Sequence, residues 1–240
     1  MVLLFPKNLS ESAKSLLQLY DLFPFHKHPL WIGVQEGTLE KQQIILAEGQ
    51  HYLRTKAGQV LRKEAMEKCL SLSNRLWEAI IETYLEECTE EDGTPTHLEL
   101  IQRLLYEGGV DDSQQLNLID TPGNAAAKAL YKDISARGAG CHIIGAGMVE
   151  WFYSQLSPKV FSSYTNNYKF TEFAAETYKI HGVMDQTHAA RAFEVVDEAV
   201  RAHGFDLVES SVRDAFVAIS LHYDGMLQAA TGKFEYWNGN

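Results

Sequence analysis

The sequence has little of what marks several large protein classes. Its 240 residues include only three cysteines, Cys69, Cys88 and Cys141, and no CxxC pair. This pattern does not fit a disulfide framework or a structural zinc ribbon. The apolar runs are short and interrupted by charge, which excludes a good membrane span or cleavable signal peptide. We therefore expect a soluble, cytoplasmic protein.

Positive charge is also scarce. There are 21 Lys and Arg residues against 32 Asp and Glu residues, for a net charge of −11. Binding to nucleic acid needs a basic surface, so we expect small molecules or proteins as partners instead. The sequence lacks internal repeats, low-complexity tracts and a linker, which predicts one domain over residues 1–240.

Alternating strand patterns are absent, whereas helical periodicity runs through nearly the whole chain. Apolar residues recur every three or four positions, and Ser10 and Thr38 are candidate helix caps. The segment 110–123 is the least regular and reads as a long connector. These patterns predict an all-α fold of about seven to nine helices. The helical segments include 9–23, 28–55, 97–109, 171–204 and 208–232.

Residues 181–188 read HGVMDQTH, with His181, Asp185 and His188 at helical spacing. A helix turns by about 100° per residue, so these side chains point within roughly 60° of one another. One interpretation is a hydrogen-bonded cluster or a surface face. The other is a metal site, because two imidazoles and a carboxylate suit iron, manganese or zinc.

A second candidate region lies in residues 84–97, YLEECTEEDGTPTH. A helix ending at Glu86 and Glu87 is followed by a turn on Asp92, Gly93 and Pro95, and His97 then starts another helix. Each of these residues also has an ordinary explanation, because an acidic run is usually solvated surface and a histidine at a helix start often bonds to the turn.

Glu150 is the third candidate, because it is the only carboxylate between Asp133 and Glu172. Its neighbours in GAGMVEWFY are mostly apolar, and an unpaired carboxylate would be costly to bury among them. Either Glu150 is partly exposed or bound cations remove that cost. Together the three regions offer enough carboxylates and histidines for two metal ions.

The order Glu-x9-His, a lone mid-chain Glu and HxxxDxxH resembles the haem-oxygenase-like diiron oxidases and oxygenases, the group around the CADD-like and TenA/PqqC-related proteins. The HPLW, GTL and QHY features of residues 28–53 also look like that superfamily, and the similarity runs from about residue 26 to 195. It implies an all-α, haem-oxygenase-like helical bundle and no bound haem. The ligands that it implies are Glu87, His97, Glu150, His181, Asp185 and His188.

The resemblance implies an oxidoreductase with two Fe ions, or Mn or a mixed Fe/Mn pair, and dioxygen as co-substrate. The organic substrate would be a small amino acid, amine, aromatic acid or fatty acid. A homodimer is common among such proteins, and no electron donor is indicated. In the CADD-like subgroup a tyrosine precedes the mid-chain glutamate, but Val149 stands here. This difference argues against that subgroup's self-sacrificing chemistry.

Several assignments stay open. Glu86 competes with Glu87, and Glu48 or Glu64 could be the additional upstream ligand of some family members. His203 and His222, outside the motif, read as structural or surface residues.

A substrate pocket is expected beside the metals. Four glycines near Glu150 leave room for one, although close helix crossing explains them better: Gly138, Gly140, Gly145 and Gly147. Nearby aromatic residues, which are more often core than substrate contacts, are Trp151, Phe152, Tyr153, Tyr164 and Tyr168.

Three other functions remain as alternatives. A TenA-like thiamine hydrolase needs a cysteine nucleophile, for which Cys141 is the only candidate. A cofactor-free, PqqC-like oxidase would use histidines for proton transfer. A non-catalytic module would bind a partner through the acidic surface and the aromatic tail KFEYWNGN.

Overall fold

A computed structural model describes residues 6–90 and 94–239. Within these ranges the chain forms eleven α-helices and no β-strand, so the all-α prediction is confirmed and the count of seven to nine is wrong. One extra helix, α6 (Asp112–Leu116), lies in the predicted connector and starts with a capping box between Asp111 and Gln114. The turn predicted on Asp92 and Gly93 lies outside the described residues.

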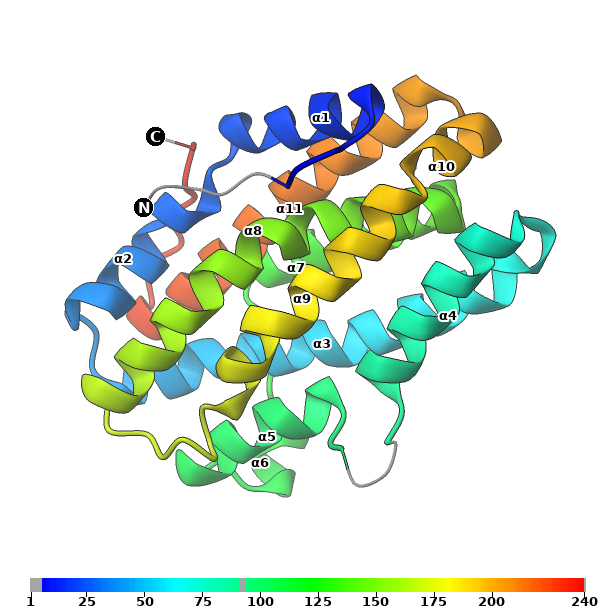
Figure 1. The fold of residues 1–240 in the computed structure, drawn as a ribbon. Helices are drawn as coiled ribbons and strands as arrows, with labels where there is room; N and C mark the ends of the chain where they lie inside the picture. Colours follow the sequence, from blue (N-terminus) through cyan, green and yellow to red (C-terminus); the bar gives the residue numbers. More distant parts are fainter. Residues whose placement is uncertain (1–5, 91–93, 240) are drawn as a thin grey trace.

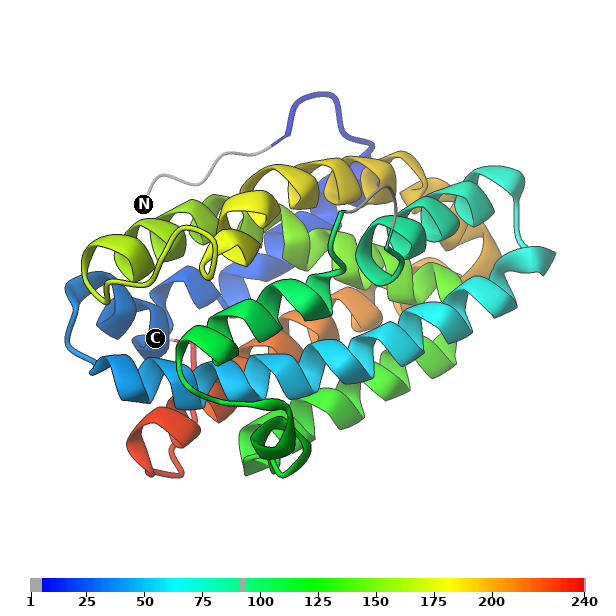
Figure 2. The same cartoon turned by 90° about the horizontal axis from the view of Figure 1, so that it is seen from below.

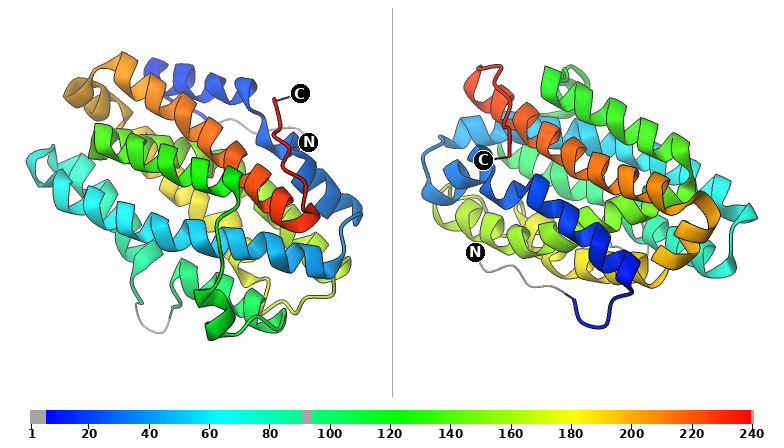
Figure 3. Two further views of the ribbon diagram at one scale, coloured as in Figure 1. Left: turned by 180° about the vertical axis from the view of Figure 1, so that it is seen from behind. Right: turned by 90° about the horizontal axis from the view of Figure 1, so that it is seen from above.

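Five helices build the centre of the molecule. They are α3 (Lys41–Lys68), α7 (Pro122–Arg137), α8 (Ala139–Asn166), α9 (Glu176–Glu194) and α11 (Phe205–Thr231). Helix α8 packs against α9 and α11, and α11 also packs against α7 and α3 (Figures 1 and 3). None of the described helices has the length and apolar character needed to span a bilayer.

Shorter helices cover this centre. On one side α1 (Glu11–Gln18) and α10 (Val196–His203) contact α11, and α2 (Pro29–Glu36) contacts α8. On the other, α4 (Asn74–Cys88) and α5 (His97–Glu107) contact α3 and α9, and the view from below shows them beside α3 (Figure 2). The end of α4 and the start of α5 thus lie near both α3 and α9.

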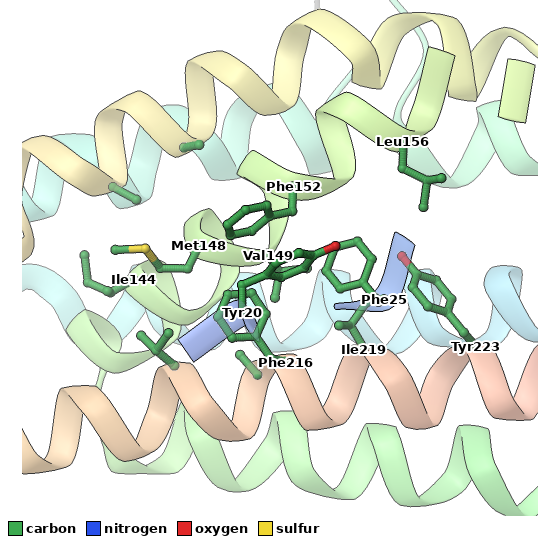
Figure 4. Close-up of a cluster of buried hydrophobic side chains, with 14 of the residues drawn as sticks. Tyr20, Phe25, Ile144, Met148, Val149, Phe152, Leu156, Phe216, Ile219 and Tyr223 are labelled. Carbon is green, nitrogen blue, oxygen red and sulfur yellow. The ribbon is translucent and has the colours of Figure 1, made fainter. Parts of the chain in front are cut away.

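Aromatic rings fill the core between the N-terminal segment, α8 and α11. Tyr20 stacks on Phe152 with ring centroids 3.6 Å apart, and Phe216 meets Tyr20 edge-on (Figure 4). Burying such side chains contributes on the order of 2–3 kcal/mol each. This packing fixes α8, which is the helix that carries Glu150.

The HPLW segment has a structural role. His28 Nδ1 caps α2 by accepting a hydrogen bond of 3.1 Å from the backbone N–H of Leu30. Its Nε2 then donates to Asp224 Oδ1 at 3.1 Å, and the backbone N–H of Trp237 donates to the same oxygen at 2.8 Å. The start of α2 and the C-terminal segment are therefore both tied to α11.

Glycines allow the central helices to cross closely. A Cβ built on Gly147 would lie 2.2 Å from Ala192 Cβ, so the helix-crossing interpretation is confirmed there. His203 is structural, because its ring occupies the space that a Cβ on Gly138 or Gly140 would enter. A Cβ on Gly225 of α11 would lie 2.4 Å from the backbone nitrogen of Asn124 on α7.

We predict that Gly225→Ala lowers the free energy of unfolding by about 2 kcal/mol, because backbone atoms of α7 must move to admit the methyl group. The matched control is Gly58→Ala on α3, where a Cβ would meet nothing within 4 Å. That change should stabilise the protein by about 0.5–1 kcal/mol through helix propensity. Urea unfolding measures both, and equal stability of the two variants would contradict this account of the α7–α11 contact.

Candidate metal centre

The six predicted ligand residues meet at one place inside the bundle. Glu87 comes from the last turn of α4, His97 from the first residue of α5 and Glu150 from α8, while α9 contributes the other three. Two groups have potential ligand atoms within 4.8 Å of one another, and Glu87 belongs to both. The first group is Glu87, His97 and His181. The second group is Glu87, Asp185 and His188.

In the first group, His181 points one ring nitrogen at Glu87. Its Nδ1 lies 2.6 Å from the carbonyl oxygen of Thr177, which can only accept a hydrogen bond. Nδ1 therefore carries a proton, and Nε2 lies 3.6 Å from Glu87 Oε1. His97 lies alongside with ring centroids 4.0 Å apart, and its Nδ1 donates to Glu87 Oε2 at 2.9 Å.

In the second group, His188 is oriented in the same way by Glu86. Its Nε2 donates to Glu86 Oε2 at 2.9 Å, and Arg191 holds that carboxylate with hydrogen bonds of 2.6 and 2.7 Å. His188 Nδ1 is left facing Glu87 Oε1 at 3.6 Å, Glu150 Oε2 at 3.7 Å and Asp185 Oδ1 at 3.9 Å. Glu87 thus lies inside the cluster and Glu86 behind it.

Four polar atoms of this cluster are buried without a hydrogen-bond partner. They are Glu150 Oε2, His181 Nε2, Asp185 Oδ2 and His188 Nδ1. Leaving such acceptors unsatisfied costs about 1–3 kcal/mol each, and more for charged groups. All four are of the types that bind iron, manganese or zinc, at bond lengths of about 2.0–2.2 Å for zinc. The residues present therefore fit a metal centre.

Arg62 of α3 is the residue that the sequence reasoning missed. Its Nη2 lies 3.1 Å from Glu150 Oε1 and 3.5 Å from Glu87 Oε2. Burial disfavours the charged form, but Glu87 and Glu150 outweigh it and raise the pKa of Arg62. Arg62 follows His51 by eleven residues, about three helical turns, so the two share a face of α3.

The titrating groups of the cluster influence one another. Burial and the neighbouring His181 lower the pKa of His97 to about 3. Burial would also lower the pKa of His181, but Asp185 and Glu87 raise it to about 9. Burial raises the pKa of Asp185, whereas Arg62 and His97 hold that of Glu87 down despite its burial. The cluster is thus short of positive charge.

The two upstream glutamates lie outside this cluster. Glu64 is half-exposed beside Lys68. Glu48 is buried and accepts hydrogen bonds from Tyr164, Tyr178 and His51, the last at 3.0 Å. Because His51 has its ring centroid 5.6 Å from that of His97, Glu48 belongs to a network next to the cluster.

A cavity extends from the cluster toward α7 and α11. Its far wall includes Tyr131, Ile134, Ala215, Ile219 and Met226, and Gly145 and Tyr153 also line it. Of the predicted aromatic residues only Tyr153 lies in this wall. His222 is buried, in keeping with the structural alternative, and its Nδ1 donates a 2.8 Å hydrogen bond to Asn124 Oδ1. It also lines the cavity.

Cys141 is buried in the hydrophobic core and is not among the residues that line this cavity. Burial raises the pKa of its thiol, which disfavours the reactive thiolate. The described part of the chain therefore offers no cysteine nucleophile in the cavity wall for a TenA-like hydrolysis.

Comparison with solved structures supports the helical fold. The chain is similar to a protein of unknown function with a haem-oxygenase-like fold from Shewanella denitrificans OS217, with 16% identity, a TM-score of 0.71 and coverage of 91% of this chain and 89% of that one. It is also similar to a CADD-like protein of unknown function from Nostoc punctiforme PCC 73102, with 15% identity, a TM-score of 0.70 and coverage of 93% and 97%. A TenA homologue from Pseudomonas syringae pv. tomato DC3000 has 11% identity, a TM-score of 0.73 and coverage of 95% and 99%.

No curated protein matches the sequence. A family described as iron-containing redox enzyme matches residues 65–221, which is more than half of the chain and spans all six clustered residues. With its haem-oxygenase-like fold, the chain belongs to this family of iron-containing redox enzymes.

Proposed function

We propose that this protein is a non-haem dinuclear iron oxidase or oxygenase that oxidises a small organic substrate held in the cavity. The observation that carries the proposal is the set of four unsatisfied, buried ligand-type atoms that face one another across α8 and α9. A single buried acceptor has several explanations, but four in one cluster need a compact positive charge.

The two groups of side chains suggest how two ions would be held. His97 and His181 would bind one ion, Asp185 and His188 would bind the other with Glu150, and Glu87 is placed to contact both. When bound, such a pair of ferrous ions supplies electrons for the reduction of dioxygen.

The surrounding residues prepare the ligands for this task. The carbonyl of Thr177 and the carboxylate of Glu86 hold the protons of His181 and His188 on the outer ring nitrogens. The inner nitrogens are then free to bind metal, as partners of metal-binding histidines commonly ensure. Arg62 restrains Glu150 at the cavity side, and the apolar far wall excludes water from the reacting substrate.

We predict that chelator-treated protein titrated anaerobically with ferrous iron binds about two ions per chain and consumes oxygen when air is admitted. His188→Ala should weaken iron binding by at least about tenfold, because it removes a ligand. His203→Ala is the control, since this ring packs on Gly138 and Gly140 away from the cluster. Absence of iron binding by the natural protein, or equal binding by both variants, would contradict the proposal.

A second prediction concerns the residue behind His188. Glu86→Gln should weaken iron binding by about 10–100-fold while the protein stays folded, because the amide no longer fixes the His188 tautomer. Glu82→Gln is the matched control, because Glu82 also lies on α4 and pairs with Arg191 at 2.9 Å but is 56% exposed. Anaerobic calorimetry measures both. If Glu86→Gln binds iron as Glu82→Gln does, Glu86 has no role in positioning His188.

A further inference from the structure

The cavity wall contains three strongly basic side chains, and two of them have acidic partners. Lys128 donates to Asp120 at 2.7 Å, and Arg62 bonds to Glu150 at 3.1 Å. Arg54 is different, because it forms no ion pair with any carboxylate of the described residues, and its Nε is buried without a hydrogen-bond partner.

The neighbours of Arg54 do not neutralise it. Its guanidinium carbon lies 5.8 Å from the ring centroid of Tyr131, to whose hydroxyl the side chain also hydrogen-bonds, and its Nε donor is left without a partner. The nearby imidazoles of His51 and His222 have partners of their own, Glu48 at 3.0 Å and Asn124 at 2.8 Å. A guanidinium without a carboxylate partner among the described residues therefore lies on the α7 side of the cavity that Glu87, His97 and Glu150 also line.

The walls next to Arg54 are apolar. Leu61 of α3, Val149 of α8 and the α7 and α11 residues Ile134, Ala215, Ile219 and Met226 line the same cavity. A ligand that uses both features needs one anionic end and an apolar body. A carboxylate matches a single guanidinium in charge and in its two-pronged geometry. A phosphate dianion would bring a second negative charge that Arg54 does not neutralise, and the carboxylates of the cluster would repel it.

We propose that Arg54 binds the carboxylate of the substrate, which is a small monocarboxylic acid with an apolar body. The body lies along the apolar wall, between Arg54 and the metal centre. The placement of the reacting carbon next to the metals rests on the proposed function, whereas binding of the carboxylate by Arg54 does not.

The test uses chelator-treated protein, so that the probe has no metal to bind. Octanoate and 4-phenylbutyrate are titrated by calorimetry into the natural protein, with octanamide as the neutral probe. We expect at least one acid to bind saturably and more tightly than octanamide. Arg54→Met should weaken binding of that acid by about 10–100-fold, the range expected for a hydrogen-bonded charge.

Two further variants separate charge from folding. Arg54→Lys should recover part of the affinity, and Arg75→Met, on the exposed outer part of α4, should leave it unchanged. If Arg54→Met does not fold, Arg54→Gln replaces it. Failure of both acids to bind the natural protein, or equal affinity in the Arg54 variants, would overturn the assignment.

The outcome is independent of the iron experiments. Protein that binds an acid through Arg54 but binds no ferrous iron keeps this inference and rejects the proposed oxidase. Protein that binds iron but shows no carboxylate binding through Arg54 keeps the proposed oxidase and rejects this inference.

Discussion

Buried lone pairs without a donor are the constraint on which the candidate site depends. Hydrogen bonds from outside fix the outer nitrogens of His181 and His188 as donors, and their inner nitrogens, like Asp185 Oδ2 and Glu150 Oε2, have no hydrogen-bond partner. The positive charge of Arg62 reaches Glu87 and Glu150 only from one side. Desolvation on this scale costs several kcal/mol, and metal cations are the compact charges that would offset it.

The fold supplies this arrangement through a few close contacts. Helix α9 contributes three residues from one face, and Gly147 lets α8 approach α9 so closely that Glu150 reaches the same point. The end of α4 and the start of α5 bring Glu87 to His97. Helix α3 closes the other side with arginines, one paired with the cluster and one facing the apolar cavity. The site is therefore acidic at one end and basic at the other.

Helical spacing was sufficient to predict that α9 presents its residues on one face, and the all-α fold followed from the same periodicity. Spacing could not separate Glu86 from Glu87, because both lie in the last turn of α4 and the choice depends on Arg191, far away in the sequence. Arg62 was missed because a single arginine on a long, charged helix has no local signature. The helix count failed at α6, where a capping box in an irregular segment starts a short helix, and at Val195, where the predicted segment 171–204 divides into α9 and α10.

The central claim is that the clustered acids and imidazoles surround a pair of iron ions. The most direct measurement is anomalous X-ray scattering at the iron edge, from crystals of protein loaded with ferrous iron under anaerobic conditions. The account predicts two peaks, one beside His97 and His181 and one beside Asp185 and His188, with Glu87 in contact with both. Absence of iron from this cluster, or peaks confined to other sites, would contradict it.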